Sequence, residues 1–225
     1  MKNWTFVFDL DGTLVDTAPD LAAATNHVLG TIGLHAISEA DIRPHVGHGA
    51  LAMITQAASA HGRTLSERDT YDLFEVFLAH YSAHLADHSR PYENVIETLE
   101  LLRCEGARLA VCTNKIEAHA KALLDALEMT DLFVAITGRD SLGVWKPDPG
   151  HFNGTVALAN GNSKQSIMIG DSETDIKTAK AAGVPVIAVD FGYSVEPVAS
   201  FAPDVIISHY RELPAALRQL SSCDA

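Results

Sequence analysis

The 225-residue sequence has few cysteines, no long apolar run and a deficit of basic residues. Its three cysteines, Cys104, Cys112 and Cys223, are odd in number and include no Cys-x-x-Cys pair, so we expect neither a disulfide framework nor a thiolate metal site. No apolar run approaches the roughly 18 residues of a membrane span, and the first residues show no signal-peptide pattern. We therefore expect a cytoplasmic protein with no membrane partner.

Basic residues are outnumbered, because 16 lysines and arginines face 29 aspartates and glutamates, for a net charge of −13. Such a surface repels polyanions, so we expect no nucleic-acid partner. An anionic substrate would need a bound cation and a few placed basic side chains to reverse the local field. The 47% of hydrophobic residues is typical of a folded globular protein.

Short apolar runs recur along the chain, each followed by a helical pattern. The runs span residues 4–8, 109–112, 133–136, 167–169, 186–189 and 205–207. Most are continuous rather than alternating, as in strands buried on both faces of a parallel sheet. Helices are expected over residues 92–102, 116–127, 149–159, 174–182 and 214–220. The pattern predicts the α/β class with a doubly wound parallel-sheet core.

A long insertion separates the first predicted strand from the second. It is about a hundred residues long, far more than one crossover helix requires. Helical patterns cover residues 20–29, 38–43, 50–60 and 67–85, with glycines between them. We assign residues 17–85 to an inserted helical domain, and residues 1–16 and 86–225 to a discontinuous core. Two connections join these parts, a geometry that allows hinge motion.

Two carboxylates follow the first predicted strand, Asp9 and Asp11, and they precede Gly12 and Thr13. Residues i and i+2 of extended chain point the same way, so the two charges are costly unless a cation or a shared proton lies between them. Gly12 permits a tight phosphate-binding turn, and the Thr13 hydroxyl can donate to an anion. The alternative is a capped strand-to-helix turn, which the position at a strand's carboxyl end disfavours.

Two weaker candidates follow later in the chain. Thr113 and Asn114 stand after the second predicted strand and before a helix, whose N-terminus attracts anions. Lys146 lies beside two prolines ahead of another helix, where a fixed ammonium could hold a phosphate. Taken alone, Thr113 and Asn114 are as well explained as helix caps, and Lys146 as a solvated residue at a helix entry.

A second acidic group, Asp171 and Asp175, follows the predicted strand at residues 167–169. If Ser172 begins a helix, the two carboxylates can converge on one point despite their spacing. A cluster of carboxylate oxygens suits a hard cation such as Mg²⁺. The alternative is a helix cap by Asp171 with Asp175 in solvent.

Together and in this order, these four segments resemble the haloacid dehalogenase superfamily of phosphohydrolases. The resemblance spans nearly the whole chain, and it is specific because all four motifs are present. Residues 6–23 are especially similar to bacterial phosphoglycolate phosphatases, and residues 46–50 and 212–214 are softer signals of the same kind. The resemblance implies a Rossmann-like core and a mobile helical cap.

The resemblance also implies roles for the motif residues. Asp9 would attack phosphorus to form an aspartyl phosphate, and Asp11 would protonate the leaving alkoxide and later activate water. Mg²⁺ would be held by the Asp9 side chain, the Asp11 backbone carbonyl and Asp171, with Asp175 assisting. Thr113, Asn114 and Lys146 would bind the transferring phosphoryl group. Because Mg²⁺ and Lys146 offset the charge of an anionic phosphoester, this arrangement meets the requirement set by the acidic composition.

Substrate choice should lie in the insert, where Arg43 and His48 are the candidate substrate contacts. A guanidinium matches a carboxylate with paired hydrogen bonds, so Arg43 would sense the acid of 2-phosphoglycolate, the predicted substrate. A surface ion pair is the alternative for Arg43. His80, His84 and His88 fall on one helical stripe, but no carboxylate motif accompanies them and we predict no metal there.

Other functions remain open from sequence. They are hydrolysis of another small phosphoester such as a sugar phosphate or nucleotide, a phosphoglucomutase-like phosphotransfer, and a catalytically silent regulatory relative. Dehalogenase chemistry is disfavoured because Asp11, Asp171 and Asp175 indicate a metal site, which carbon–halogen displacement does not require. The expected partner is a small anionic phosphoester, and the expected assembly is a monomer or homodimer.

Overall fold

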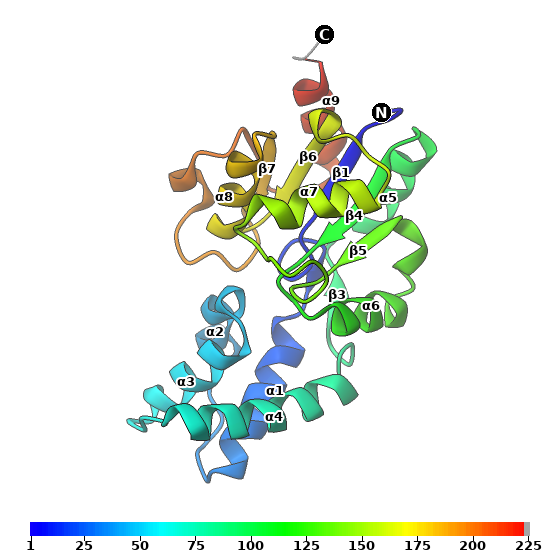
Figure 1. Ribbon diagram of the computed structural model, residues 1–225. Helices are drawn as coiled ribbons and strands as arrows, with labels where there is room; N and C mark the ends of the chain where they lie inside the picture. The colour runs from blue at the N-terminus through cyan, green and yellow to red at the C-terminus, as the bar shows by residue number, and fades with distance from the viewer. Residues whose placement is uncertain (223–225) are drawn as a thin grey trace. The chain divides into compact units, whose positions relative to one another are not determined.

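The computed structural model describes residues 1–222, which form two compact units (Figure 1). The α/β unit comprises Met1–Val15 and the chain from Pro91 onwards, and the helical unit comprises Asp16–Arg90. At the two connections, β2 (Val15–Asp16) pairs with β3 (Arg90–Pro91). Cys104 and Cys112 are free thiols, while Cys223 lies outside the described residues.

The α/β unit is built on a six-stranded sheet in the order β5-β4-β1-β6-β7-β8. Its strands are β1 (Thr5–Phe8), β4 (Arg108–Cys112), β5 (Ala135–Thr137), β6 (Ser166–Gly170), β7 (Val186–Val189) and β8 (Val205–Ile207). Every neighbouring pair is parallel, with Phe6 opposite Leu109 on one side and Ile167 on the other. The predicted doubly wound α/β fold is confirmed. Strand order reverses at β1, where ligands bind in sheets of this kind.

Helices cover both faces of this sheet (Figure 1). They are α5 (Val95–Cys104), α6 (Glu117–Ala126), α7 (Pro149–Leu158), α8 (Glu173–Ala182) and α9 (Leu213–Ser221). Helices α7 and α8 pack against each other and on the central strands, while α5 contacts α9 and β4. One core cluster joins Val7 and Met168 of the sheet to Phe152 of α7 and Ile176 of α8, all of them buried. Residues 5–8 are fully buried because they face helices on both sides.

The helical unit contains four α-helices and a 3-10 turn. They are α1 (Ala18–Thr31), α2 (Glu39–Ile42), η1 (Arg43–His48), α3 (Ala50–Ala60) and α4 (Glu67–Ala83). Helices α1, α3 and α4 pack on one another. Leu73, Phe77 and Tyr81 recur every four residues and form the buried stripe of α4. Ser66 caps this helix by accepting a 3.1 Å hydrogen bond from the Asp69 backbone.

The boundaries of the units differ from those predicted. The first falls after Val15 rather than after residue 16, and the second after Arg90 rather than after residue 85. Residues 86–90 stay with the helices because the backbone N–H groups of His88 and Ser89 donate to the buried Asp20 carboxylate, at 2.8–3.1 Å. Helix α5 begins at Val95 rather than residue 92, since Asn94 adopts a left-handed φ of 62° that a helix cannot include.

No helix within residues 1–222 is both long and apolar enough to cross a membrane. This agrees with the sequence, which has no apolar run of the required length.

Candidate active site

Three segments that leave the carboxyl ends of neighbouring strands bring the predicted polar residues together. Asp9 follows β1, Thr113 follows β4 and Asp171 follows β6, and these strands lie side by side. Lys146 reaches the same place from the segment before α7. All of these side chains come from the α/β unit. The structure therefore assembles the four sequence motifs at the point where strand order reverses.

Lys146 lies at the centre of the site. Its Nζ atom is 2.8 Å from Oδ1 of Asp9 and 2.6 Å from Oδ1 of Asp175, and the residue is only 3% exposed. Burial acts to lower the pKa of Lys146, but the charges of Asp175 and Asp9 outweigh it and raise the pKa. The ammonium is therefore permanently charged beside the predicted nucleophile.

Asn114 holds the backbone of Lys146. Its Nδ2 atom donates to the Lys146 carbonyl at 2.9 Å, and its Oδ1 accepts from the Lys146 N–H at 3.0 Å. The sequence predicted that this amide binds the phosphoryl group. In the structure both ends of the amide are engaged by one residue, so Asn114 fixes the position of Lys146.

Asp175 is fully buried and has partners on both oxygens. Oδ1 accepts from Lys146, and Oδ2 accepts from the backbone N–H and hydroxyl of Ser172 at 3.1 and 2.6 Å. Ser172 also caps α8 by accepting from the Asp175 N–H, which completes a capping box. The predicted convergence of Asp171 and Asp175 thus results from a helix that begins directly after Ser172.

Asp171 is 3% exposed and is bound by the turn after Asp9 and by a loop after β7. It accepts from the Thr13 hydroxyl at 3.0 Å and from the Tyr193 N–H at 2.7 Å. Gly12 has a φ of 80°, and a Cβ there would lie 2.5 Å from Oδ2 of Asp171. The Thr13 hydroxyl therefore donates to Asp171, whereas the sequence predicted that it donates to an anionic substrate. Gly12 supplies both the backbone conformation and the room this contact needs.

The cluster of Asp9, Asp171 and Asp175 fits a metal ion. Each residue offers one carboxylate oxygen, and the three oxygens lie within 4.8 Å of one another. Oδ1 of Asp9 is buried, and the contact given for it is the ion pair with the Lys146 ammonium at 2.8 Å. Three hard carboxylate oxygens that converge in a buried site are a donor set that suits a divalent cation of the Mg²⁺ type.

Burial and the neighbouring negative charges raise the pKa values of two carboxyl groups at the site. Burial, with the charges of Asp175 and Asp9, raises the pKa of Asp171 to about 8. Burial also raises the pKa of Asp9 to about 6, against the opposing charge of Lys146. The site holds four carboxylates and two ammonium groups, from Asp9, Asp11, Asp171, Asp175, Lys115 and Lys146. When all four carboxyl groups are ionised, four negative charges face two positive charges, and one divalent cation would neutralise the excess.

Sequence reasoning missed three residues that the structure places at the site. Lys115 pairs with Asp11 at 2.8 Å, Tyr193 binds Asp171 through its backbone, and the Tyr210 hydroxyl donates to the Thr13 carbonyl at 2.9 Å. Lys115 stands beside Thr113 and Asn114, so its place in that motif was an available signal. Tyr193 lies in the loop after β7 and Tyr210 begins the 3-10 turn η5 (Tyr210–Glu212), and neither residue falls within one of the four motifs.

The two candidate substrate contacts of the helical unit have different surroundings. Arg43 donates to Asp16 at 2.9 Å and to Glu39 at 2.7 Å, both within that unit. His48 ends the 3-10 turn η1 and is exposed. The ion-pair alternative for Arg43 is thus realised, and a substrate carboxylate would have to compete with two acidic side chains.

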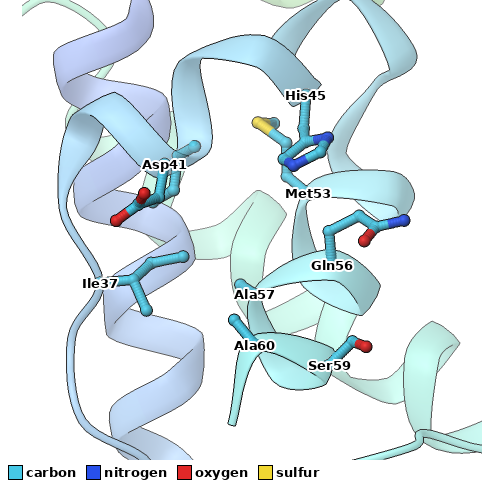
Figure 2. A pocket seen from close by; sticks show the side chains of 9 residues that line it. Ile37, Asp41, His45, Met53, Gln56, Ala57, Ser59 and Ala60 are labelled. Carbon is cyan, nitrogen blue, oxygen red and sulfur yellow. The ribbon is translucent and has the colours of Figure 1, made fainter. Parts of the chain in front are cut away.

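A pocket of about 360 Å³ lies wholly within the helical unit. Ile37 and Asp41 line one side of it, and His45, Met53 and Gln56 line the other (Figure 2). Neither Arg43 nor His48 lines this pocket.

Three imidazoles of the helical unit lie against one another. His80 lies between His27 and His84, with ring centroids 4.2 and 4.5 Å away, and His84 pairs with Asp87 at 2.7 Å. Within residues 1–222, the group whose ligand atoms converge for a metal is the acidic cluster of the α/β unit.

Comparison with known families gives a direct match. The sequence profile of the haloacid dehalogenase-like hydrolases matches residues 6–189. The chain belongs to this family. The resemblance predicted from the four motifs is therefore confirmed.

Relatives with known names cover nearly the whole of this haloacid dehalogenase-like hydrolase. A phosphoglycolate phosphatase of Mesorhizobium japonicum is 47% identical over 97% of this chain and 96% of the relative. A phosphoglycolate phosphatase of Agrobacterium fabrum is 45% identical over 94% of this chain and 91% of the relative. A crystal structure from Haemophilus somnus, described as a predicted phosphoglycolate phosphatase, has a TM-score of 0.88 at 33% identity and covers 96% of this chain and 99% of that one.

Proposed function

We propose that this protein hydrolyses 2-phosphoglycolate to glycolate and phosphate, with Mg²⁺ as cofactor and an aspartyl phosphate as intermediate. That the enzyme is a phosphatase follows from its family and from the names of its relatives. The substrate is proposed because relatives at 47% and 45% identity are named for it. The observation that carries the chemistry is the position of Asp9 beside Lys146 and next to two further buried carboxylates.

In the first step, a carboxylate oxygen of Asp9 bonds to phosphorus while the bond from phosphorus to the leaving oxygen breaks. Asp11 gives its proton to that oxygen, so the product leaves as an alcohol rather than an alkoxide. In the second step, water bonds to phosphorus and gives a proton to Asp11, while the bond from phosphorus to Asp9 breaks. Phosphate leaves, and both carboxyl groups return to their starting states.

The remaining residues bind and orient. The Lys146 ammonium holds Asp9 and offsets the charge of the phosphoryl group. The Thr113 hydroxyl accepts from the Lys115 N–H at 3.2 Å, which leaves its own hydrogen for a phosphoryl oxygen. Asp9, Asp171, Asp175 and the Asp11 carbonyl would hold Mg²⁺, which when bound neutralises charge that develops on the phosphoryl oxygens.

The helical unit and its residues also have proposed roles. Arg43 and His48 stay predicted substrate contacts, and the helical unit stays a predicted cap. A cytoplasmic location and a monomeric or homodimeric state are likewise proposals.

The test compares kcat/KM for 2-phosphoglycolate, ethyl phosphate and glucose 6-phosphate in the presence of Mg²⁺. Ethyl phosphate has a methyl group in place of the carboxylate, so we expect a preference for 2-phosphoglycolate of about tenfold or more. Equal values for the first two esters would refute the substrate, and formation of an isomeric sugar phosphate would favour a phosphotransferase. No phosphate release from any ester would favour a silent relative.

Arg43→Ala tests the residue assignment, and Arg68→Ala is its control. Arg68 lies in the same unit, is 91% exposed and faces Asp72 at 4.0 Å. If Arg43 senses the substrate carboxylate, the preference for 2-phosphoglycolate falls only in Arg43→Ala. If the preference survives in both variants, the assignment of Arg43 is wrong and the substrate proposal stands.

A further inference from the structure

Lys115 is a second buried lysine at the site, and it contacts a different carboxylate from Lys146. Its Nζ atom lies 2.8 Å from Oδ1 of Asp11, and the two side chains are 7% and 18% exposed. A lysine this well buried is stable in its charged form only when it is paired. The contact joins segments that are far apart in the chain, because Asp11 follows β1 and Lys115 follows β4.

The backbone around Lys115 is fixed at both ends. Its N–H donates to the Thr113 hydroxyl at 3.2 Å, and its carbonyl accepts from the Arg139 N–H at 2.9 Å. Gly138 packs so closely that an added Cβ would lie 2.6 Å from the Lys115 carbonyl oxygen. The ammonium is therefore presented from a rigid loop rather than from a mobile surface chain.

A proton-transfer group needs this kind of support. The Asp11 carboxylate can rotate about two side-chain bonds, yet it has to reach the leaving oxygen in one step and a water molecule in the next. A hydrogen-bonded ammonium on one oxygen restrains that rotation.

We propose that Lys115 is a positioning residue that orients the Asp11 carboxylate for proton transfer. The inference rests on the role proposed above for Asp11. Lys115 acts through Asp11, whereas Lys146 acts on Asp9 and the phosphoryl group. The alternative is that Lys115 binds the substrate directly.

The test is a double-mutant cycle in the full chain, with 2-phosphoglycolate and saturating Mg²⁺. Lys115→Met should lower kcat by roughly tenfold to 100-fold with little change in KM, because a misplaced catalytic group costs about that much. Lys115→Arg, which keeps the charge, should recover part of the loss. In an Asp11→Asn background, Lys115→Met should lower kcat by less than about twofold, since the group that it positions has already been removed.

Lys121→Met is the matched control. Lys121 lies on α6 a few residues further on, is 54% exposed and pairs with Glu117 at 2.5 Å. Its substitution should leave kcat unchanged. Far-UV circular dichroism and thermal midpoints confirm that each variant is folded, and Lys115→Gln replaces Lys115→Met in the cycle if the latter does not fold.

Two outcomes overturn the inference. One is a rise in KM without a fall in kcat, which would make Lys115 a substrate-binding residue. The other is an equal loss of kcat with and without Asp11, which would show that Lys115 acts independently. If Asp11→Asn alone leaves kcat unchanged, the role of Asp11 in the proposed function fails first, and the inference fails with it.

Discussion

Gly12 lies where backbone conformation and space for Asp171 are both required. We predict that Gly12→Ala abolishes most activity and weakens Mg²⁺ binding, because a Cβ there would meet Asp171 at 2.5 Å and Tyr193 at 2.8 Å. The left-handed φ of 80° adds roughly 1–2 kcal/mol of strain. Activity is measured as a function of Mg²⁺ concentration, and stability by thermal unfolding.

Gly183→Ala is the control that separates the effect of backbone strain from that of a steric clash with Asp171. Gly183 has a φ of 69° in the same unit, but no atom lies within 4 Å of the position of its Cβ. It should lose similar stability and keep the parent's activity and Mg²⁺ requirement. Equal activity in the two variants would contradict the tight contact between Gly12 and Asp171.

At the scale of single residues, the sequence identified the acids but not all of their partners. Asp9 and Asp171 converge with Lys146 as expected, because the two acids follow strand ends and the lysine directly precedes a stiff proline segment. The Asn114 amide and the Thr13 hydroxyl were predicted to face the substrate, whereas they bind Lys146 and Asp171. Such choices depend on which groups meet in three dimensions, and spacing along the chain does not encode that.

The capping box of helix α8 includes Asp175, which is also a residue of the site. The stability of the helix and the position of this carboxylate therefore depend on the same hydrogen bonds. We predict that Ser172→Ala costs about 1 kcal/mol through the lost cap and also raises the Mg²⁺ concentration needed for half-maximal activity. The second effect arises because Oδ2 of Asp175 loses the Ser172 hydroxyl, a 2.6 Å bond. Thermal unfolding and Mg²⁺ titration of activity measure the two effects.

Ser66→Ala is the matched control for Ser172→Ala. Ser66 caps α4 with the same pattern, since its hydroxyl bonds Asp69 Oδ2 at 2.7 Å, but the pair is exposed on the helical unit. It should lose similar stability and keep the parent's Mg²⁺ requirement. A shared change in Mg²⁺ requirement would mean that capping alone, rather than the position of Asp175, is responsible.

The helices and strands were predicted more accurately than the residues at which they begin and end. Continuous apolar runs located all six strands of the sheet, because strands buried on both faces leave that signal in the sequence. Helix α4 ends at Ala83 rather than residue 85, and residues 43–48 continue α2 as a 3-10 turn. The end of the helical unit depends on the bonds from His88 and Ser89 to Asp20, a long-range contact that no local pattern reveals.

For the whole molecule, stability should depend on pH through the acidic cluster. The pKa values of Asp9 and Asp171 are raised from 3.8 to about 6 and about 8. Groups with a raised pKa bind protons more tightly in the folded state, so their stabilising effect is complete below about pH 4 and is lost as pH rises to 8. At pH 9, metal-free Asp171→Asn should therefore unfold at a higher temperature than the metal-free parent, by several degrees if the gain is about 2 kcal/mol.

Metal binding should reverse this trend. Mg²⁺ should stabilise the parent more at pH 9 than at pH 6, since the ligands must be deprotonated to bind it. Thermal unfolding of parent and Asp171→Asn at both pH values, with EDTA or with Mg²⁺, gives the full comparison. If the metal-free parent is no less stable than Asp171→Asn at pH 9, the carboxylates are not in mutual repulsion and the metal-site assignment loses its physical basis.

The central claim is that Asp9 carries the phosphoryl group. It is tested most directly by mixing the enzyme with 2-phosphoglycolate and Mg²⁺, quenching in acid within the first turnovers, and mapping phosphorylated peptides by mass spectrometry. We predict the added mass of one phosphoryl group on Asp9, its absence in Asp9→Asn, and its normal presence in Asp131→Asn, an exposed aspartate of the same unit. Phosphate release from an enzyme that carries no phosphoryl group on Asp9 at any quench time, or carries one on another residue, would contradict the account.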